Sequence, residues 1–386
     1  MKAARFEYLS PTRVVFGIGS LEEAGTQARR LGDRALIICG HGAMRRHGVL
    51  DRVTALLEER GLSVSVYDGV SPDPKSDEVD AALALARQHG CDMLVGLGGG
   101  SALDAAKAAS VAVDRDSVAE LIGETLAPNP SSLPVLAIPT TAGSGAEVTK
   151  GAIVTDVERS FKSGIRGEDV FPRVAIVDPE LSATMPPAVA AETGFDALTH
   201  AVETYVARRA NPFTEAMSEN AARLLGPGLS ALAASPADAE LRARLSYAAL
   251  LGGFTVAAAS TCLPHRLQQA MGAARNFPLS HGRGLAVLYP AWLERAYPYA
   301  QAKFDRLGEL LGEGDVRAAL ERILAELELD VGLAELGFSS TDLDACMEAI
   351  SGNVDNDPID GIEPPLMRAI YEDSRQPNLE RANRKE

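Results

Sequence analysis

The sequence predicts an α/β N-terminal Rossmann-like domain followed by an all-α C-terminal domain. Up to about residue 185, short apolar runs alternate with amphipathic helical patterns, which is typical of a doubly wound parallel sheet. Beyond Met185-Pro186-Pro187, strand-like runs almost vanish and an Ala/Leu-rich helical pattern continues to about residue 350. We therefore expect two domains in this chain of 386 residues, at 1–185 and 186–386, with a ligand cleft between them.

The composition is that of an ordinary soluble globular protein, with 46% hydrophobic and 23% charged residues. Lys and Arg number 37 against 53 Asp and Glu, which gives a net charge of −16 without any basic block. This balance argues against nucleic acid or an anionic membrane as partner. No apolar run reaches the length of a signal or a membrane span. The four scattered cysteines indicate reduced thiols, so we expect a cytoplasmic protein.

The N-terminal half supplies the strands of the predicted sheet. Residues 6–16 predict strand structure broken near Pro11, and Ser20 predicts the N-cap of a helix that ends at about Leu31. The continuous apolar run at 35–39 is expected of a parallel strand that is covered on both faces. By the same patterns, strands are expected at 35–39, 64–67, 93–97, 135–138, 152–155 and 174–177, with helices at 49–60 and 76–89.

A glycine-rich turn follows the predicted strand at 93–97. It consists of Gly98, Gly99, Gly100 and Ser101, and a helix is expected from Ala102. Residues without side chains let backbone N–H groups approach a diphosphate, and the N-terminus of the helix adds a partial positive charge. The turn is neither a GxGxxG nor a P-loop motif, and many strand-to-helix turns are rich in glycine. Its position directly after a buried strand favours nucleotide binding.

A second polar turn follows the predicted strand at 135–138. The stretch 139–148 is rich in hydroxyl-bearing and small residues, which suit a second wall of a nucleotide cleft. The alternative is an ordinary polar turn between two elements.

Asp196 and three of the six histidines suit a metal centre. Asp196 and His200 are four residues apart, so in a helix the carboxylate and the imidazole point to one side. His265 lies in another helical pattern, and His281 precedes a glycine. One carboxylate oxygen and three imidazole nitrogens make a compact ligand set for a divalent transition metal. The alternative is that these are ordinary polar residues of the surface or core.

Four motifs, in chain order, resemble the iron-containing, group III, alcohol dehydrogenases. They are GGGSALDAAK from Gly98, PTTAGSGAEVT from Pro139, DPEL from Asp178 and GFDALTHAVE from Gly194. The similarity extends along essentially the whole chain. The resemblance implies a dehydroquinate synthase-like fold, an NAD or NADP cofactor, a small alcohol or aldehyde as substrate and a homodimer.

The resemblance also assigns roles to individual residues. It implies that the cofactor is bound by Gly98, Gly99, Gly100 and Ser101 at the diphosphate, by Thr140, Thr141 and Ser144 along the adenosine and nicotinamide, and by Asp104 and Lys162 nearby. It implies that Asp196, His200, His265 and His281 bind Fe(II) or, alternatively, zinc; nitrogen and oxygen donors suit both metals. The metal is expected to act as a Lewis acid on the substrate oxygen, with hydride supplied by the nicotinamide.

Two departures from the family pattern concern proton transfer and cofactor choice. Gln269 stands where the family has a second histidine near the substrate oxygen; an amide can donate a hydrogen bond but cannot shuttle a proton. The alternative is that Gln269 merely packs. Gly40 stands where an acidic residue would bind the ribose 2′-OH, with Arg45 and Arg46 shortly after, so we expect NADPH to be accepted. The alternative is that both arginines are solvated helix residues.

A third departure is the arginine content beside the metal segment. Arg266, Arg275 and Arg283 suit a carboxylate or phosphate group, which suggests an anionic aldehyde such as a semialdehyde or phosphonoacetaldehyde as substrate. The alternative is that these arginines lie on the surface or at a subunit contact.

The leading hypothesis is a metal-dependent NAD(P)H oxidoreductase that interconverts a primary alcohol and an aldehyde or ketone, working as a reductase. The alternative is a dehydroquinate synthase-like lyase or cyclase that recycles NAD. Such an enzyme needs lysines and arginines to hold a phosphate substrate, and this chain is poor in lysine around its metal segment. The intact ligand set and diphosphate turn argue against a third class, a non-catalytic homologue.

Overall fold

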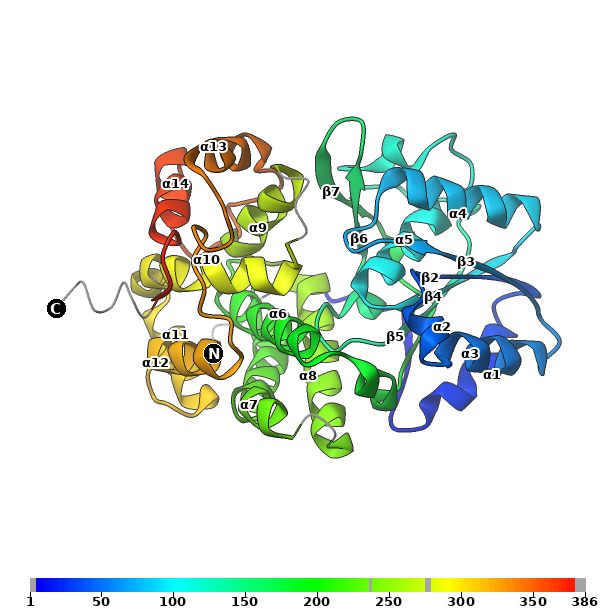
Figure 1. The fold of residues 1–386 in the computed structure, drawn as a ribbon, viewed down its shortest axis with the longest axis horizontal. Coiled ribbons are helices and arrows are strands. Elements are labelled where there is room, and N and C mark those ends of the chain that lie inside the picture. Colours follow the sequence, from blue (N-terminus) through cyan, green and yellow to red (C-terminus); the bar gives the residue numbers. More distant parts are fainter. Residues whose placement is uncertain (1–4, 236–237, 275–278, 379–386) are drawn as a thin grey trace. The chain divides into compact units, whose positions relative to one another are not determined.

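A computed structural model describes residues 5–235, 238–274 and 279–378 (Figure 1). The chain divides into two compact units. One unit, Leu9–Met185, holds a parallel sheet with helices, and the other is helical and begins at Pro186. Residues 5–8 group with the helical unit, where the Tyr8 ring packs edge-on against Phe213 with ring centroids 4.5 Å apart. The fold class predicted from the sequence is confirmed.

Six parallel strands form the sheet of the α/β unit, in the order β1-β8-β5-β4-β2-β3. They are β1 Arg13–Phe16, β2 Arg34–Gly40, β3 Ser63–Val70, β4 Met93–Gly98, β5 Val135–Pro139 and β8 Val174–Val177. The central strands β4 and β5 are buried along their whole length. Because both faces of these strands are covered, their sequences are continuous apolar runs, as the sequence analysis predicted.

Helices surround this sheet. The α-helices are α1 Ala24–Ala28, α2 Ala43–Arg46, α3 Val49–Glu58, α4 Ser76–Gln88 and α5 Gly100–Val111, and the 3₁₀ helices are η1 Ser20–Glu23, η2 Val118–Leu121, η3 Ala146–Val148, η4 Glu168–Val170 and η5 Pro179–Thr184. Along β2, Leu36 and Ile38 pack in one apolar cluster with Leu83 of α4. Ile37 packs in a second cluster with Val53 of α3. Successive side chains of a strand point to opposite faces, so the two clusters are the two halves of the core.

Two predictions for the start of the chain need correction. Of the strand structure expected at 6–16, the part after Pro11 is present as β1 Arg13–Phe16, but residues 5–12 contain no strand. Ser20 is not an N-cap; Gly19 occupies that position with a φ of 77° and no side-chain cap. Asp178 provides the acceptor instead, because its carboxylate binds the backbone N–H groups of Gly19 at 3.2 Å and of Leu21 at 3.0 Å. Asp178 lies 159 residues after Gly19, so a local sequence pattern could not identify it.

A separate antiparallel hairpin consists of β6 Gly151–Asp156 and β7 Phe161–Arg166. The strand predicted near 152–155 therefore exists, but it does not belong to the parallel sheet. The carboxylate of Asp156 closes the hairpin turn by accepting the backbone N–H groups of Glu158 and Arg159, each at 2.9 Å. The hairpin packs on α5, the helix that begins at the glycine-rich turn.

The helical unit is built around α6 Pro187–Val206, whose residues from Gly194 to Val206 are all buried (Figure 1). The other helices are α7 Pro212–Ala234, α8 Ala239–Ala259, α9 Leu263–Ala274, α10 His281–Ala296, η6 Tyr297–Tyr299, α11 Gln301–Leu311, α12 Val316–Glu326, α13 Ser340–Ala349 and α14 Pro364–Asp373. A Cβ atom on Gly194 would lie 2.4 Å from Leu229, and one on Gly252 would lie 3.2 Å from the Cβ of His200. Close packing against α7 and α8 therefore fixes the central part of α6.

Within the described ranges, no single helix has the length and apolar composition needed to cross a bilayer. One bent pair, Ala239–Ala259 with Leu263–Gly272, meets both criteria when its two helices are taken together, with a bend of 99° between them.

Candidate functional site

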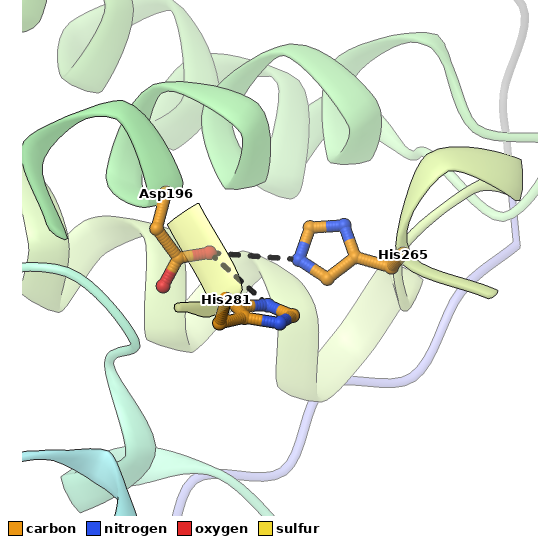
Figure 2. Close-up of side chains that lie close together, drawn as sticks. All are labelled: Asp196, His265 and His281. Carbon is orange, nitrogen blue, oxygen red and sulfur yellow. Dashed lines mark ion pairs between the residues drawn. The ribbon is translucent and has the colours of Figure 1, made fainter. Parts of the chain in front are cut away.

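Four side chains of the helical unit converge on one point. Asp196 and His200 lie one turn apart on the same face of α6. His265 lies near the start of α9, and His281 is the first residue of α10. The three histidine Nε2 atoms lie at similar distances from Oδ1 of Asp196: 3.6 Å for His200, 3.7 Å for His265 and 3.5 Å for His281. Figure 2 shows the side chains of Asp196, His265 and His281 facing one another.

This donor set fits a divalent transition metal. A tetrahedral cation with ligand bonds of about 2.1 Å keeps its ligand atoms about 3.4 Å apart, close to the distances around Asp196. The Oδ1 atom of Asp196 is buried and accepts no hydrogen bond from any residue that the structure describes. A buried carboxylate oxygen of this kind is costly unless a cation compensates its charge. The residues present therefore suit a bound cation better than a packed core.

Hydrogen bonds on the outer side of two rings determine which nitrogen faces the cluster. The Nδ1 atom of His265 lies 2.8 Å from Oε1 of the buried Glu203 carboxylate, so Nδ1 carries the donated proton. The Nδ1 atom of His281 donates to Oε1 of Gln268, because an amide oxygen can only accept. In the neutral form of each ring, Nε2 then carries the lone pair that a metal binds.

The cluster is also electrostatically coupled. Burial alone would raise the pKa of Asp196, but the imidazoles of His200 and His281 outweigh this and hold its pKa well below the ordinary value. Burial lowers the pKa of His265, but the Glu203 carboxylate, with Asp196, outweighs it and raises that pKa to about 9. Because a metal binds ionised carboxylate and neutral imidazole, we expect cation binding to displace a proton from this site.

The sequence analysis missed the two residues that orient these rings. Glu203 lies seven residues after Asp196, so both lie on one face of α6 and the helical period alone contained this signal. Its carboxylate is fully buried and also accepts the backbone N–H of Cys262 at 2.7 Å. Gln268 bonds to His281 on a different helix, and no local pattern indicates that contact.

Asp357 anchors the first turn of α9. Its carboxylate accepts the backbone N–H of Leu263 and the Nε1–H of Trp292, each at 2.9 Å. Burial raises the pKa of Asp357 to about 6, and these hydrogen bonds offset only part of that rise. The buried thiol of Cys262 donates to the backbone oxygen of Glu203 at 3.4 Å. The start of α9, the helix that carries His265, is thus tied to both α6 and the loop before α14.

Gln269 lies one turn after His265 on α9 and is 8% exposed. Its Oε1 atom accepts a hydrogen bond from Nη1 of Arg266 at 3.1 Å. The same guanidinium donates through Nη2 to the hydroxyl of Thr261. The predicted position of Gln269 near the substrate oxygen stays a prediction.

Of the three arginines that suggested an anionic substrate, Arg266 and Arg283 are engaged within the protein. The guanidinium of Arg283 pairs with Glu192 of α6, with 2.9 Å between Nε and Oε1. Arg266 bonds to Thr261 and Gln269, and Arg275 lies outside the described residues. A guanidinium that already pairs with a carboxylate is less available to an anionic substrate.

The glycine-rich turn of the α/β unit joins β4 to α5 and packs against the second polar turn. Gly98 has a φ of 144°, which a residue with a side chain rarely adopts. A Cβ atom on Gly99 would lie 3.3 Å from Thr141, and one on Gly100 would lie 2.9 Å from Oγ of Ser144. The backbone N–H of Thr140 donates to the oxygen of Gly98 at 2.9 Å. The structure therefore brings the two turns together. In the first turn of α5, the N–H groups of Ala102 and Leu103 donate to the oxygen of Gly99 at 3.0 and 3.2 Å, so those of Gly100 and Ser101 are the ones without an acceptor in the helix.

Ser101 and Lys162 meet through a residue that the sequence analysis missed. The hydroxyl of Ser101 accepts the backbone N–H of Asp73 at 3.2 Å, and the Asp73 carboxylate binds Nζ of Lys162 at 2.7 Å. Asp73 has a φ of 57°, an uncommon value for a residue other than glycine and a mark of local strain. Asp104 instead binds Lys107 at 3.1 Å and the backbone N–H of Ile153 at 3.0 Å, which ties α5 to the hairpin.

Gly40 is the last residue of β2, where a Cβ atom would lie 3.2 Å from the backbone oxygen of Val70. The exposed guanidinium of Arg45 pairs with Asp68 of the neighbouring strand at 3.1 Å. The Arg46 guanidinium lies against the backbone at Gly42, where a Cβ atom would be 2.8 Å from Nη1. Two cationic side chains thus lie on the short helix that follows Gly40.

A cavity of about 280 Å³ lies near the C-terminal end of α5, away from the glycine-rich turn. Val111, Leu121, Leu126 and Asn129 are among its lining residues, and it contains none of the predicted site residues.

Comparison with known proteins identifies the family. A family model described as iron-containing alcohol dehydrogenase matches residues 11–179, and a second, the C-terminal part of the Fe-containing alcohol dehydrogenase family, matches residues 190–359. The chain belongs to the iron-containing alcohol dehydrogenase family. The resemblance inferred from the four sequence motifs is confirmed. Family membership favours an oxidoreductase that interconverts alcohols and carbonyl compounds with a nicotinamide cofactor over the lyase alternative.

Individual family members align over most of their length. Alcohol dehydrogenase 4 of Schizosaccharomyces pombe is 35% identical over 346 residues, which cover 88% of this chain and 81% of that protein. NADPH-dependent butanol dehydrogenase of Clostridium saccharobutylicum is 35% identical over 286 residues, covering 72% and 71%. Among solved structures, a 1,3-propanediol oxidoreductase superposes with a TM-score of 0.90 at 32% identity, covering 96% of this chain and 100% of that one.

Proposed function

We propose that the protein is a metal-dependent aldehyde reductase that uses NAD(P)H and binds its cation through Asp196, His200, His265 and His281. The main support for this proposal is that the Nε2 atoms of three histidines converge on Oδ1 of Asp196, a buried oxygen that accepts no hydrogen bond from the described residues. The outer hydrogen bonds from His265 to Glu203 and from His281 to Gln268 support it, because they leave the inner nitrogens as donors to a cation.

When bound, the cation supplies Lewis-acid polarisation of the substrate oxygen. The chain's own residues provide orientation. Glu203 and Gln268 keep the rings of His265 and His281 from rotating, and Asp357 fixes the backbone of α9. Glu203, Gln268 and Asp357 are fully buried, whereas His281 is partly exposed. Exclusion of water from the three buried groups strengthens their electrostatic interactions.

The cofactor proposal rests on the α/β unit. Gly98, Gly99, Gly100 and Ser101 are proposed to bind the diphosphate through backbone N–H groups, with Thr140, Thr141, Ser144, Asp104 and Lys162 around it. The close approach of the two turns supports this, since a side chain on Gly100 would collide with Ser144. NADPH is proposed as the preferred cofactor because Gly40 lacks a carboxylate, and Arg45 and Arg46 follow it.

The experiment that tests this function measures NADPH oxidation with a panel of aldehydes. We expect activity in protein loaded with Fe(II) or zinc, loss of activity after removal of the metal with a chelator, and recovery when the metal is restored. Loaded, folded protein that oxidises neither NADPH nor NADH with any aldehyde would overturn the proposal. Activity that persists unchanged without metal would overturn the role of the cluster.

The finer substrate proposal, an anionic aldehyde, depends on the arginines near the cluster. The Arg283–Glu192 ion pair and the hydrogen bonds of Arg266 to Thr261 and Gln269 weaken it, and its remaining support is the closeness of the arginines to the cluster in the sequence. Butyraldehyde and succinic semialdehyde test it, because the two substrates have the same chain length and differ in the terminal carboxylate. A higher kcat/KM for the semialdehyde is expected from an anionic site, and a preference for butyraldehyde would contradict it. The homodimer and the cytoplasmic location stay predictions.

A further inference from the structure

The hydrogen bond between Arg266 and Gln269 determines the orientation of an amide that follows a ligand histidine by one helical turn. Nη1 of Arg266 donates to Oε1 of Gln269 at 3.1 Å. A guanidinium has donors and no acceptor, so the amide oxygen must face Arg266 and the NH₂ group must point away. The hydrogen bond that the structure gives the Gln269 amide among the described residues is the one its oxygen accepts from Arg266. Gln269 therefore presents a donor, and only a donor, to whatever lies beside it.

Arg266 is itself held in place. Its side chain is 7% exposed, and its Nη2 atom donates to the hydroxyl of Thr261, which precedes α9. Gly352 lies close by, since a Cβ atom added to this glycine would be 3.3 Å from both Cδ and Nη1 of Arg266. The hydrogen bonds to Thr261 and Gln269 favour the guanidinium orientation that holds the amide oxygen. A flip of the Gln269 carboxamide, which would exchange its donor and acceptor ends, is thus disfavoured.

We propose that Arg266 is a positioning residue. Its hydrogen bond to Oε1 of Gln269 keeps the NH₂ group of that amide directed at the substrate oxygen, to which the NH₂ group donates. The proposal rests on the proposed reductase function and on the placement of Gln269 and His265 on one face of α9. A bound nicotinamide would supply hydride to the carbonyl carbon, and the C=O π electrons would then move to the oxygen, which would become an alkoxide. A fixed N–H donor stabilises that growing charge more than it stabilises the neutral carbonyl.

Proton transfer follows a separate route. The carboxamide cannot give up a proton at ordinary pH, so the alkoxide takes its proton from water to form the alcohol. NAD(P)H, an aldehyde and one proton are thereby converted to NAD(P)⁺ and an alcohol. The site combines a donor for the charged oxygen with a solvent source of protons, in place of a single histidine that would do both.

Two substitutions of Gln269 test the donor. Gln269→Glu keeps the size and the acceptor that faces Arg266 but replaces the donor with an oxygen. Gln269→Met removes the donor at similar volume without adding charge. We expect each variant to lower kcat for aldehyde reduction by about 100-fold, the usual loss for one such donor, with KM for NADPH and metal content unchanged. If Gln269 only packs, Gln269→Met keeps nearly full kcat, and that result overturns the proposal.

Two substitutions of Arg266 test the positioning role. Arg266→Met removes the clamp and is expected to lower kcat by about 10-fold, and Arg266→Lys, which keeps one donor, is expected to restore part of the loss. Binding of an unreactive primary amide, whose carbonyl oxygen replaces that of the aldehyde, provides a readout independent of turnover. We expect its dissociation constant with the metal- and NADPH-loaded protein to rise in Gln269→Met, Gln269→Glu and Arg266→Met, but less in Arg266→Lys.

Unchanged analogue affinity in folded Gln269→Met overturns the proposal even where Arg266 variants fail to fold. Failure of the proposed function looks different, since the wild-type protein would then reduce no aldehyde. If the wild type is active and Gln269→Met is equally active, the inference about Arg266 and Gln269 is wrong, but the proposed reductase function still holds.

Discussion

The carboxylate of Glu203 lies 2.8 Å from Nδ1 of His265, and both side chains are buried. This contact joins α6 to α9 on the side of the ring that faces away from Asp196. The hydrogen bond selects the tautomer with the lone pair on Nε2, and the negative charge makes that lone pair more basic. The affinity of the cluster for a cation therefore depends on a residue that is not itself a ligand.

Glu203→Gln preserves the shape of this side chain but removes its charge. We expect metal affinity to fall by about 10- to 100-fold, as measured by titrating the apo-protein with zinc in competition with a chelator. Glu219→Gln is a matched control. Glu219 lies on α7 and outside the cluster, and it accepts a hydrogen bond at 2.9 Å from the hydroxyl of Tyr205 on α6, the helix that carries Glu203. Equal zinc affinity of folded Glu203→Gln and the control would contradict the role assigned to Glu203.

Gly284→Ala tests how His281 is held. The added Cβ would lie 2.9 Å from Cγ and 3.1 Å from Nε2 of Gln268, so the glutamine must shift and loosen its bond to His281. Overpacking of this kind costs about 1–3 kcal/mol in the free energy of unfolding. We expect both a lower melting temperature of the apo-protein and weaker zinc binding. Gly151→Ala, where the nearest atom is 3.9 Å away, is the comparison variant. Similar behaviour of the two variants would argue against a role for Gln268.

Gly40→Asp tests cofactor choice. A carboxylate at the end of β2 repels a 2′-phosphate and accepts a hydrogen bond from a ribose 2′-OH. We expect kcat/KM with NADPH to fall by at least about 10-fold relative to kcat/KM with NADH. Gly40→Asn has the same shape and the same approach to Val70 but no charge, so it separates steric from electrostatic effects. An unchanged ratio of NADPH to NADH efficiency in Gly40→Asp would place the ribose elsewhere.

The buried carboxyl group of Glu147 is expected to make the stability of the α/β unit depend on pH. Burial raises the pKa of Glu147 from 4.5 to about 7, although Lys107 partly opposes the rise. The folded state binds this proton more tightly than the unfolded chain, so the contribution to stability is complete below the unfolded pKa and is lost as pH rises through 7. We expect the free energy of unfolding of the wild type, relative to Glu147→Gln, to fall by about 2–3 kcal/mol between about pH 5 and pH 8.

Urea unfolding followed by far-ultraviolet circular dichroism measures this difference. Glu158→Gln, at the exposed hairpin turn, is the control and should keep the slope of the wild type. A constant difference between the wild type and Glu147→Gln across this range would show that Glu147 does not bind a proton more tightly in the folded state.

Helical periodicity predicted that Asp196 and His200 lie close together, because both residues belong to one helix. The same periodicity contained Glu203, which was overlooked because a carboxylate two turns from a ligand has no distinctive local signature. Periodicity gave no indication that Gln268 would contact His281 or that Glu192 would contact Arg283. Their contacts with His281 and Arg283 depend on how α10 packs against α9 and α6, and a sequence pattern does not specify that packing.

Strand prediction succeeded where the chain is buried on both faces, as in β4, since continuous apolar runs result from that environment. In β6, buried and partly exposed residues alternate, which is the pattern of a hairpin strand with one covered face. The sequence identified this strand but not its sheet. Asp73 was missed for another reason: its strained backbone and its bond to Lys162 arise only when the loop before α4 meets β7.

The thiol of Cys262, enclosed between α6 and the start of α9, offers a natural reporter of motion. Cys39, Cys262 and Cys346 are buried, whereas Cys91 is partly exposed, so in a Cys91→Ser protein a maleimide meets no accessible sulfur until the fold opens. Alkylation of Cys262 requires the helix that carries His265 to separate from its neighbour. The rate of that alkylation therefore measures how often α9 separates from α6, and binding of the proposed cation should lower this rate.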